Sequence, residues 1–179
     1  MNSNRKVILY IAMSLDGFIA KHDDDISFLS QVEQEGEDYG YSAFIEIVDT
    51  VILGRKTYDK VLSMGFEVPY GERDVYVLTR SSNPDSGTVH YYSGNLTDLI
   101  SRLKKQDGKN IYCDGGAETV HAFVRDDLFD ELIISIIPIL LGDGIRLFGQ
   151  NFQEQQLQLI QSRSFEKGLV QLHYIRVRD

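Results

Sequence analysis

The stretch KNIYCDGGAETVHAFV, residues 109–124, contains one strand-to-helix unit of the chain. Residues 109–113 have the apolar and aromatic pattern of a buried strand. The pair Gly115-Gly116 then opens a helix, whose inward-facing residues are Val120, Phe123 and Val124. Paired glycines between a buried strand and a helix allow the backbone to come very close to a pyrophosphate. The unit therefore points to a layered α/β fold with a binding site in a turn.

Strand and helix patterns alternate along the rest of the chain, which favours an α/β fold with a largely parallel sheet. The expected strands are residues 6–13, 50–53, 74–79, 109–113, 132–141, 156–162 and 169–177. Helices are expected over residues 39–48, 56–64 and 95–106 and after Gly116, with a further helix start near residues 26–29. The last two strands are expected to be antiparallel neighbours. Ligands of such sheets bind at the carboxyl ends of strands, so function is expected in the turns that follow them.

The segment 132–141 is apolar on both faces, which predicts a central or nearly central strand. Its Pro138 lacks an N–H donor and therefore requires a bulge or an unpaired edge position. This strand and the two closing strands offer more apolar edge than a small monomer usually leaves open. We therefore expect a homodimer.

Length and charge narrow the class of protein. The chain has 179 residues, 18 Lys and Arg, and 27 Asp and Glu, which give a formal net charge of −9. With no linker or repeat in the sequence, residues 1–179 are expected to form one domain. An acidic chain repels phosphate backbones, so a nucleic-acid partner is not expected. Cys113 stands alone, so it can form no intramolecular disulfide and is by itself no metal site.

No membrane segment is expected. The most apolar stretch, residues 132–141, is ten residues long and contains Ser135 and Pro138. A membrane-spanning helix needs about 20 predominantly apolar residues. We therefore expect a cytoplasmic protein without a membrane partner.

The first strand-to-helix turn that suits an anion is residues 53–57, LGRKT. Gly54 lets the backbone approach a ligand closely, and the helix start offers free N–H groups with a partial positive charge. Arg55, Lys56 and the Thr57 hydroxyl add donors for phosphate. The alternative is an ordinary helix start with solvated basic side chains.

The second turn is residues 78–82, LTRSS. Thr79, Arg80 and Ser81 place one base among hydroxyl groups directly after a strand, a set that suits a second phosphate such as a ribose 2′-phosphate. Loops rich in Ser, Thr and Arg are common, so this turn alone is a weak signal.

The third turn is residues 113–119, CDGGAET, within the stretch quoted first. It does not match the G-x-G-x-x-G dinucleotide fingerprint of the doubly wound fold. Asp114 has two interpretations: it caps the following helix, or its carboxylate points into a site. Together the three turns fit one dinucleotide laid across a sheet.

Five segments of the sequence resemble the dihydrofolate reductase-like superfamily. They are AMSLDGFIA (12–20), GRKTY (54–58), LTRS (78–81), GG (115–116) and PILLGDGIRLF (138–148). The closer resemblance is to the branch that contains the reductase domain of bifunctional riboflavin-biosynthesis deaminase/reductase proteins. It extends from about residue 6 to residue 177, nearly the whole chain.

The resemblance implies a three-layer α/β/α fold with a mixed, mainly parallel sheet and NADPH bound across the strand ends. Arg55, Lys56 and Thr57 would contact cofactor phosphates, and Arg80 and Ser81 would lie at the adenosine 2′-phosphate. The loop 14–20 would cover the nicotinamide and the substrate. The cofactor-binding residues expected on this basis are Ala12, Gly54, Arg55, Lys56, Thr57, Thr79, Arg80, Ser81, Gly115, Gly116, Ala117 and Glu118.

The expected function is an NADPH-dependent reductase that transfers a hydride to a small heterocyclic substrate, resembling 5-amino-6-(5-phosphoribosylamino)uracil reductase. Asp16 and Asp114 are the candidate catalytic carboxyl groups, for orienting the substrate or relaying a proton. Three positions depart from the pyrimidine reductases: Tyr10 stands in place of Lys, Ser30 in place of Thr, and Asp114 in place of Glu.

Two alternatives follow from these departures. One is a non-catalytic module of the same fold that binds a nucleotide or forms oligomers, which Tyr10 favours. The other is a dihydrofolate reductase, for which Asp38 is the nearest candidate for the acid of the pterin pocket. The chain has no Trp, so the tryptophan typical of folate enzymes is missing.

Overall fold

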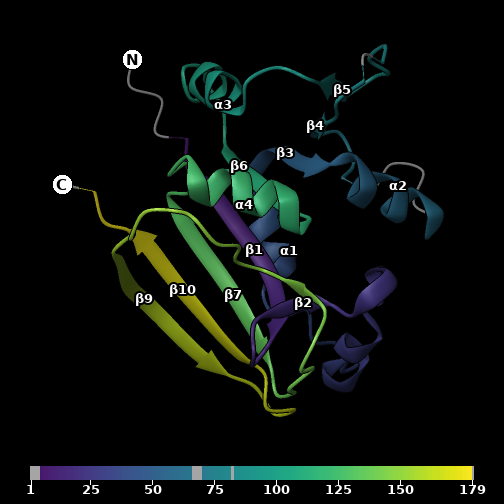
Figure 1. Ribbon diagram of the computed structural model, residues 1–179, viewed down its shortest axis with the longest axis vertical. Helices are drawn as coiled ribbons and strands as arrows, with labels where there is room; N and C mark the ends of the chain where they lie inside the picture. Colours follow the sequence, from purple (N-terminus) through teal and green to yellow (C-terminus); the bar gives the residue numbers. More distant parts are fainter. Residues whose placement is uncertain (1–4, 66–69, 82, 179) are drawn as a thin grey trace.

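The computed structural model describes residues 5–65, 70–81 and 83–178, and its centre is an eight-stranded sheet (Figure 1). Across the sheet the order is β5-β4-β3-β6-β1-β7-β10-β9. The bounds are β1 Val7–Ser14, β3 Val48–Gly54, β4 Asp74–Leu78, β5 Val89–Tyr92, β6 Asn110–Gly115, β7 Glu131–Ile137, β9 Leu157–Ser164 and β10 Val170–Arg176. The first six strands in this order run parallel, and β10 is antiparallel to both of its neighbours. The mixed, mainly parallel sheet and the antiparallel closing strands are thus confirmed.

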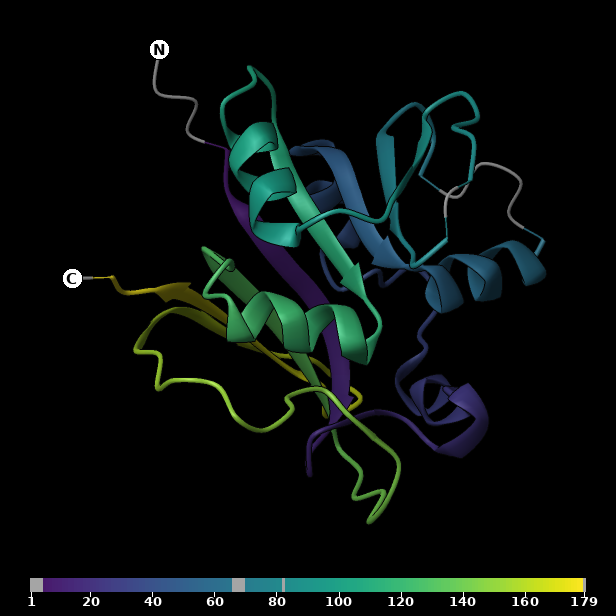
Figure 2. The ribbon, with the colours of Figure 1, turned by 45° about the horizontal axis from the view of Figure 1, so that its top comes forward.

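Helices cover both faces of the sheet and complete the predicted three layers. Their bounds are α1 Tyr41–Glu46, α2 Arg55–Ser63, α3 Leu96–Lys104 and α4 Ala117–Arg125. Figure 2 shows α3 and α4 side by side on one face, while α1 and α2 contribute Phe44 and Tyr58 to the core of the other face. Two 3₁₀ helices, His22–Asp24 and Ser27–Val32, precede α1.

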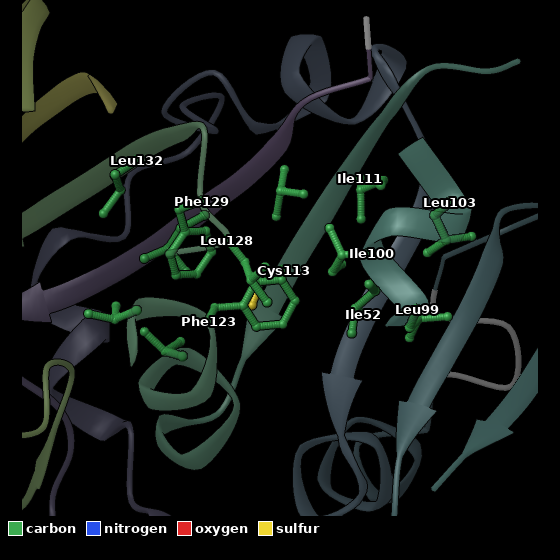
Figure 3. Packing of buried hydrophobic residues seen from close by; sticks show 14 of the residues in the cluster. Ile52, Leu99, Ile100, Leu103, Ile111, Cys113, Phe123, Leu128, Phe129 and Leu132 are labelled. Atoms are coloured by element: carbon green, nitrogen blue, oxygen red, sulfur yellow. The ribbon is translucent and has the colours of Figure 1, made fainter. Parts of the chain in front are cut away.

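The larger core lies between the sheet and the pair α3 and α4 (Figure 3). Leu99 and Leu103 of α3 and Phe123 of α4 are at most 2% exposed and pack against Ile52 and Ile111 of the sheet. Their spacing along each helix puts them on one face, as the sequence predicts. This burial fixes which face of each helix packs on the sheet.

The parallel register brings the ends of three strands together. Gly54, the last residue of β3, pairs with Leu78, the last residue of β4, and Leu53 pairs with Gly115 at the end of β6. The turns after β3, β4 and β6 therefore gather at one edge of the sheet, as expected for parallel strands.

Several boundaries differ from the sequence-based predictions. The strand expected over 132–141 ends at Ile137, because Pro138 has no N–H to continue the ladder, and Leu140 beyond it is 68% exposed. The strand does lie near the centre, between β1 and β10. The helix expected over 39–48 is wrong at both ends. Tyr39 and Gly40 have positive φ angles, which delays the helix to Tyr41, and Val48 already belongs to β3.

Other elements were not predicted or have another form. Strand β5 and the two-stranded sheet of β2 (Phe18–Ala20) and β8 (Ile145–Arg146) carry short, weak sequence patterns. The helix expected near residues 26–29 is the 3₁₀ helix Ser27–Val32. In the described ranges, none of the helices has both the length and the apolar character needed to cross a membrane.

Candidate functional site

A cavity of about 580 Å³ lies where the three turns meet. Nine of the twelve predicted cofactor-binding residues line it: Gly54, Arg55, Lys56, Thr57, Thr79, Arg80, Gly116, Ala117 and Glu118. These residues come from segments that are far apart in the sequence, and the register of β3, β4 and β6 brings them together. The prediction that the three turns form one site is consistent with this geometry.

Glycine is required at two points of the cavity wall because the two turns approach each other closely. A Cβ on Gly54 would lie 2.9 Å from Oγ1 of Thr119, and a Cβ on Gly116 would lie 2.9 Å from Oγ1 of Thr57. The backbone N–H of Gly116 donates to that same Thr57 oxygen at 2.8 Å. The start of α2 is thereby joined to the start of α4.

Helices α2 and α4 both begin at this cavity without a side-chain cap. Their N-cap residues are Gly54 and Gly116, and neither makes a side-chain cap hydrogen bond to the first turn of its helix. The first N–H groups of a helix lack intrahelical partners and carry a partial positive charge. Two such starts facing one cavity make a site that suits the phosphates of a dinucleotide.

Three basic side chains surround the same cavity: Arg55, Lys56 and Arg80. The Nε of Arg55 donates to both carboxylate oxygens of Asp59, at 2.8 and 2.9 Å, and its guanidinium lies 5.4 Å from the ring centre of Tyr91. These contacts hold the guanidinium at the cavity edge. Lys56 and Arg80 are exposed, and their side chains form no hydrogen bond to another described residue. They are therefore available to an anionic ligand.

Five further residues line the cavity beyond the predicted cofactor-binding set: Asp24, Leu78, Thr119, Ala122 and Ile145. Leu78 and Thr119 lie in the second and third predicted turns but were not assigned to the cofactor. Thr119 and Ala122 follow from the α4 periodicity once the helix start is known. Asp24 and Ile145 belong to the 3₁₀ helix His22–Asp24 and to β8, which the sequence did not predict. No local pattern connects these segments to the three turns.

Three of the predicted cofactor residues do not line this cavity. Ala12 packs against the small core cluster of Phe28 and Val32 on the other side of β1. Gly115 is buried, and its φ of +110° turns the chain into the α4 start, a conformation that favours glycine. Ser81 is exposed just beyond Arg80, while Ser82 of the same turn lies outside the described residues.

Asp16 binds backbone groups of a neighbouring loop. Its carboxylate accepts hydrogen bonds from Ser14 Oγ at 2.5 Å, Leu141 N at 3.1 Å and Gly142 N at 2.7 Å. The Ser14 hydroxyl, with smaller contributions from these backbone donors, lowers the pKa of Asp16 to about 2. The side chain is therefore ionised at neutral pH, which favours a role in joining the two loops over proton donation.

Asp38 also binds the backbone, at the start of α1. It accepts from Gly40 N at 2.8 Å and from Ser42 N at 2.9 Å. The hydrogen bond from the Ser42 side chain, followed by these backbone donors, lowers its pKa below the ordinary range. This arrangement is typical of a helix cap and does not favour the pterin-binding role considered for Asp38.

Asp114 lies at the end of β6 on the face opposite α4, so it does not cap that helix. Its carboxylate accepts hydrogen bonds from the hydroxyls of Tyr112 and Tyr70, the latter at 2.5 Å. Of the two interpretations of Asp114, the helix cap is therefore wrong, and a carboxylate that points into a site stays a prediction. Asp114 does not line the cavity of the three turns, although Gly116, two residues away, does.

No group of three or more His, Cys, Asp or Glu residues within 5–65, 70–81 and 83–178 is placed to hold a metal ion. The single thiol, Cys113, is fully buried, and burial raises its pKa above the ordinary value. It faces the core that α3 and α4 cover.

Comparisons with known proteins identify the family of the chain. The family model of the RibD C-terminal domain matches residues 5–171. The uncharacterized Bacillus subtilis protein YwjB is 46% identical over 175 residues, which are 96% of this chain and 98% of YwjB. A Shewanella sp. PV-4 protein whose crystal structure is named as that of a riboflavin biosynthesis protein is 35% identical to this chain. The two structures have a TM-score of 0.88, and the match covers 97% of this chain and 99% of that one.

A Thermotoga maritima protein named diaminohydroxyphosphoribosylaminopyrimidine deaminase/5-amino-6-(5-phosphoribosylamino)uracil reductase has a TM-score of 0.71 at 15% identity. The match covers 97% of this chain and 57% of that one, and at this identity it shows the fold alone. The predicted dihydrofolate reductase-like fold is thereby confirmed. Because the family model spans nearly the whole chain, the chain belongs to the RibD C-terminal domain family.

Proposed function

We propose that this protein is an NADPH-dependent reductase that acts on a small heterocyclic substrate. The observation that carries the proposal is the pair of uncapped helix starts, of α2 and α4, at one cavity edged by three basic side chains. Family membership adds support, because the family includes reductases that suggest a nicotinamide cofactor.

Each turn has a distinct role in this proposal. The N–H groups at the starts of α2 and α4, with the Thr57 hydroxyl, bind the pyrophosphate. Arg80, at the end of β4, binds the ribose 2′-phosphate, for which the planar guanidinium is well suited. Arg55, held by Asp59, lines the same cavity and adds positive charge in an otherwise acidic protein.

Bound NADPH supplies the hydride, and the polypeptide supplies alignment and exclusion of water. The loop that contains Asp16 is held against residues 141–142 by the carboxylate, so it is already ordered where it covers the end of β1. A preordered loop reduces the entropy lost when substrate binds.

A titration of the protein into NADPH, followed by nicotinamide fluorescence, tests the first half of the proposal. Turnover is then tested by loss of NADPH absorbance with dihydrofolate and with a panel of pyrimidine and pteridine heterocycles. Binding together with oxidation by one of these acceptors supports the reductase. Binding without oxidation by any acceptor supports the non-catalytic module instead, and oxidation by dihydrofolate alone supports a dihydrofolate reductase.

We also propose that the chain forms a homodimer through the edge of the sheet at β9. Every residue of β9 is exposed, and Leu157, Leu159 and Ile160 are between 42% and 51% exposed. An apolar, unpaired edge strand usually pairs with another chain or is otherwise protected. Light scattering at micromolar concentration should give about twice the chain mass of 20.4 kDa, and a value near 20.4 kDa would contradict the dimer.

A further inference from the structure

The lining of the cavity carries charges of both signs, and they come from different elements. The basic residues follow two neighbouring strands: Arg80 follows β4, and Arg55 and Lys56 follow β3. Among the described residues, the carboxylates of the lining are Glu118, in the first turn of α4, and Asp24, in the 3₁₀ helix after β2. A site that bound phosphates alone would gain nothing from these two acids.

The order of the strands separates Arg80 from Asp24. Along the sheet the strands are β4, β3, β6 and β1, and β2 follows β1 after a short turn. Neighbouring strands lie about 4.8 Å apart, so β4 and β1 are separated by roughly 14 Å. Figure 1 shows β4 on one side of helices α2 and α4 and β2 on the other. A ligand that contacts both Arg80 and Asp24 is therefore elongated, with unlike charges at its two ends.

The charged neighbours of Asp24 have partners, whereas Asp24 has none. His22 Nε2 lies 3.0 Å from Asp143 Oδ2, and Lys21 Nζ lies 3.2 Å from Asp25 Oδ2. The side chain of Asp24 is exposed at the cavity and forms no hydrogen bond or ion pair with any residue that the structure describes. Its carboxylate is therefore available to a ligand.

The segment that carries Asp24 is held against β8. Ala20 of β2 pairs with Ile145 of β8, which also lines the cavity. A Cβ on Gly144 would lie 2.3 Å from the carbonyl oxygen of Ala20, so the two segments are in close contact. The backbone N–H of Lys21 donates to the carbonyl of Asp25 at 2.8 Å and closes the turn around Asp24. The position of Asp24 on the cavity wall is thus fixed by its neighbours.

Glu118, the other acid of the lining, differs from Asp24 in its surroundings. It belongs to the first turn of α4, two residues after the N-cap Gly116. The partial positive charge at a helix start stabilises a carboxylate in the first turn. The protein itself thus offsets the charge of Glu118, and Asp24 is the acid of the lining whose charge is left for a ligand.

From this arrangement we infer that Asp24 binds the nicotinamide end of the cofactor and stabilises the positive charge that the ring carries in its oxidised form. The inference rests on the proposed function, in which Arg80 and the helix starts bind the phosphates. NADP⁺ and NADPH have the same phosphates and differ in charge at the nicotinamide ring, so a carboxylate beside that ring changes their relative affinity. A dihydronicotinamide that gives a hydride, one proton with two electrons, to the substrate becomes positively charged, and Asp24 favours this change.

Three ligands test the two ends of the cavity separately: NADPH, NADP⁺ and adenosine 2′,5′-bisphosphate, which lacks the nicotinamide half. Fluorescence measures the binding of NADPH, and calorimetry measures that of the other two. Asp24→Asn should weaken NADP⁺ relative to NADPH by about fivefold, the upper range for an exposed ion pair. It should not weaken the bisphosphate, because that ligand does not reach Asp24.

Asp23→Asn is the matched control. Asp23 adjoins Asp24, has the same charge and a similar φ (59° against 57°), but does not line the cavity. Asparagine tolerates a positive φ, as aspartate does, so neither substitution strains the backbone. Any general effect of removing one negative charge occurs in both variants, whereas the ratio of NADP⁺ to NADPH affinity should change in Asp24→Asn alone.

The wild-type protein gives a second test that needs no variant. Added salt weakens both forms of the cofactor through their shared phosphates, but it screens the attraction between Asp24 and the ring only for NADP⁺. The affinity for NADP⁺ relative to NADPH should therefore fall as salt rises. The same salt series on Asp24→Asn should leave the ratio nearly constant.

An unchanged ratio in Asp24→Asn, or an equal change in Asp23→Asn, would overturn the inference and leave the proposed function standing. A wild-type ratio that does not respond to salt would also overturn it. If Asp24→Asn weakens the bisphosphate as much as NADP⁺, Asp24 acts on the phosphate end or on the fold, which contradicts the inference as well. Wild-type protein that binds neither NADPH nor NADP⁺ below millimolar concentration would instead contradict the proposed function, and the inference with it.

Discussion

Helices α3, α2 and α4 are each nine residues long, and their starts differ in a way that separates structure from function. Helix α3 begins at Asn95, whose side chain accepts the backbone N–H of Asp98 at 3.1 Å. Helices α2 and α4 begin at Gly54 and Gly116, which have no side chain to offer. At the start of α3, which has only a structural role, the side chain of the N-cap residue caps the helix. Where a helix start faces the cavity, the cap is absent and the N–H groups remain open to a ligand.

The buried faces of α3 and α2 show the same contrast. Helix α3 buries Leu99, Ile100 and Leu103, whereas α2 buries only Tyr58. Helix α2 therefore adds little to the core, and its main contribution is to place the residues at its start. The following changes test this division, from the largest expected effect to the smallest.

Leu103→Ala should affect stability alone. Leu103 is 2% exposed in the core under α3, so the change loses transfer free energy and leaves a cavity, at a cost of about 2–5 kcal/mol. Urea unfolding measures the loss, and the NADPH affinity of the folded fraction should stay within about twofold. A large loss of affinity without destabilisation would place α3 in the site.

Gly116→Ala should lower both stability and cofactor binding. The added methyl would lie 2.9 Å from Thr57 Oγ1 and would push the start of α2 away from that of α4. Overpacking of this kind costs about 1–3 kcal/mol, and we expect about a tenfold loss of NADPH affinity. The φ of Gly116 is −46°, so backbone strain does not contribute. Unchanged affinity would show that the close approach of the two turns serves packing only.

Asn95→Ala removes the cap of α3 and should lower stability by about 1 kcal/mol. Asn95 does not line the cavity, so NADPH affinity should not change. The unfolding midpoint and the fluorescence titration, made on the same preparation, give both values. A loss of cofactor binding in this variant would contradict the claim that the capped start of α3 is only structural, whereas the uncapped starts of α2 and α4 bind the cofactor.

Asp16→Asn should produce a small, pH-dependent effect. The folded protein lowers the pKa of Asp16 from 3.8 to about 2, so ionisation of this group stabilises the fold above pH 3.8. That contribution is lost as the pH falls towards 2. The difference in thermal midpoint between wild type and Asp16→Asn should therefore be present at pH 6 and shrink between pH 3.8 and 2. If the difference in thermal midpoint stays constant over this range, the effect of the substitution comes from packing instead of from ionisation of Asp16.

Much of the fold followed from the sequence because its elements have strong periodic patterns. The apolar spacing of α3 and the apolar runs of β1, β6 and β7 were sufficient to predict a layered sheet. Short elements with weak patterns, β2, β5 and β8, were missed. Pro138 and the positive φ of Gly40 moved element ends by a few residues, since local backbone geometry decides where an apolar run stops being regular.

The candidate site was predictable in part for the same reason. Glycines and bases directly after strands are local signals, and the turns at Gly54, Arg80 and Gly116 were found from them. The partners of Asp16 and Asp114 were not predictable, because they are distant in sequence: Gly142 lies 126 residues from Asp16, and Tyr70 lies 44 residues from Asp114. Only tertiary structure shows that one carboxylate joins loops and that the other lies among tyrosines.

The central claim is that this cavity binds NADPH through its uncapped helix starts and Arg80. Fluorescence titrations of NADPH and NADH against wild type and Arg80→Ala test it most directly. A charge-assisted hydrogen bond contributes about 1.5–3 kcal/mol, which corresponds to roughly a 10- to 100-fold preference for NADPH over NADH. Arg80→Ala should lose that preference by weakening NADPH alone, and the wild-type preference should shrink as salt rises, because Arg80 is exposed. Equal weakening of both cofactors, or wild-type protein that binds neither below millimolar concentration, would contradict the account.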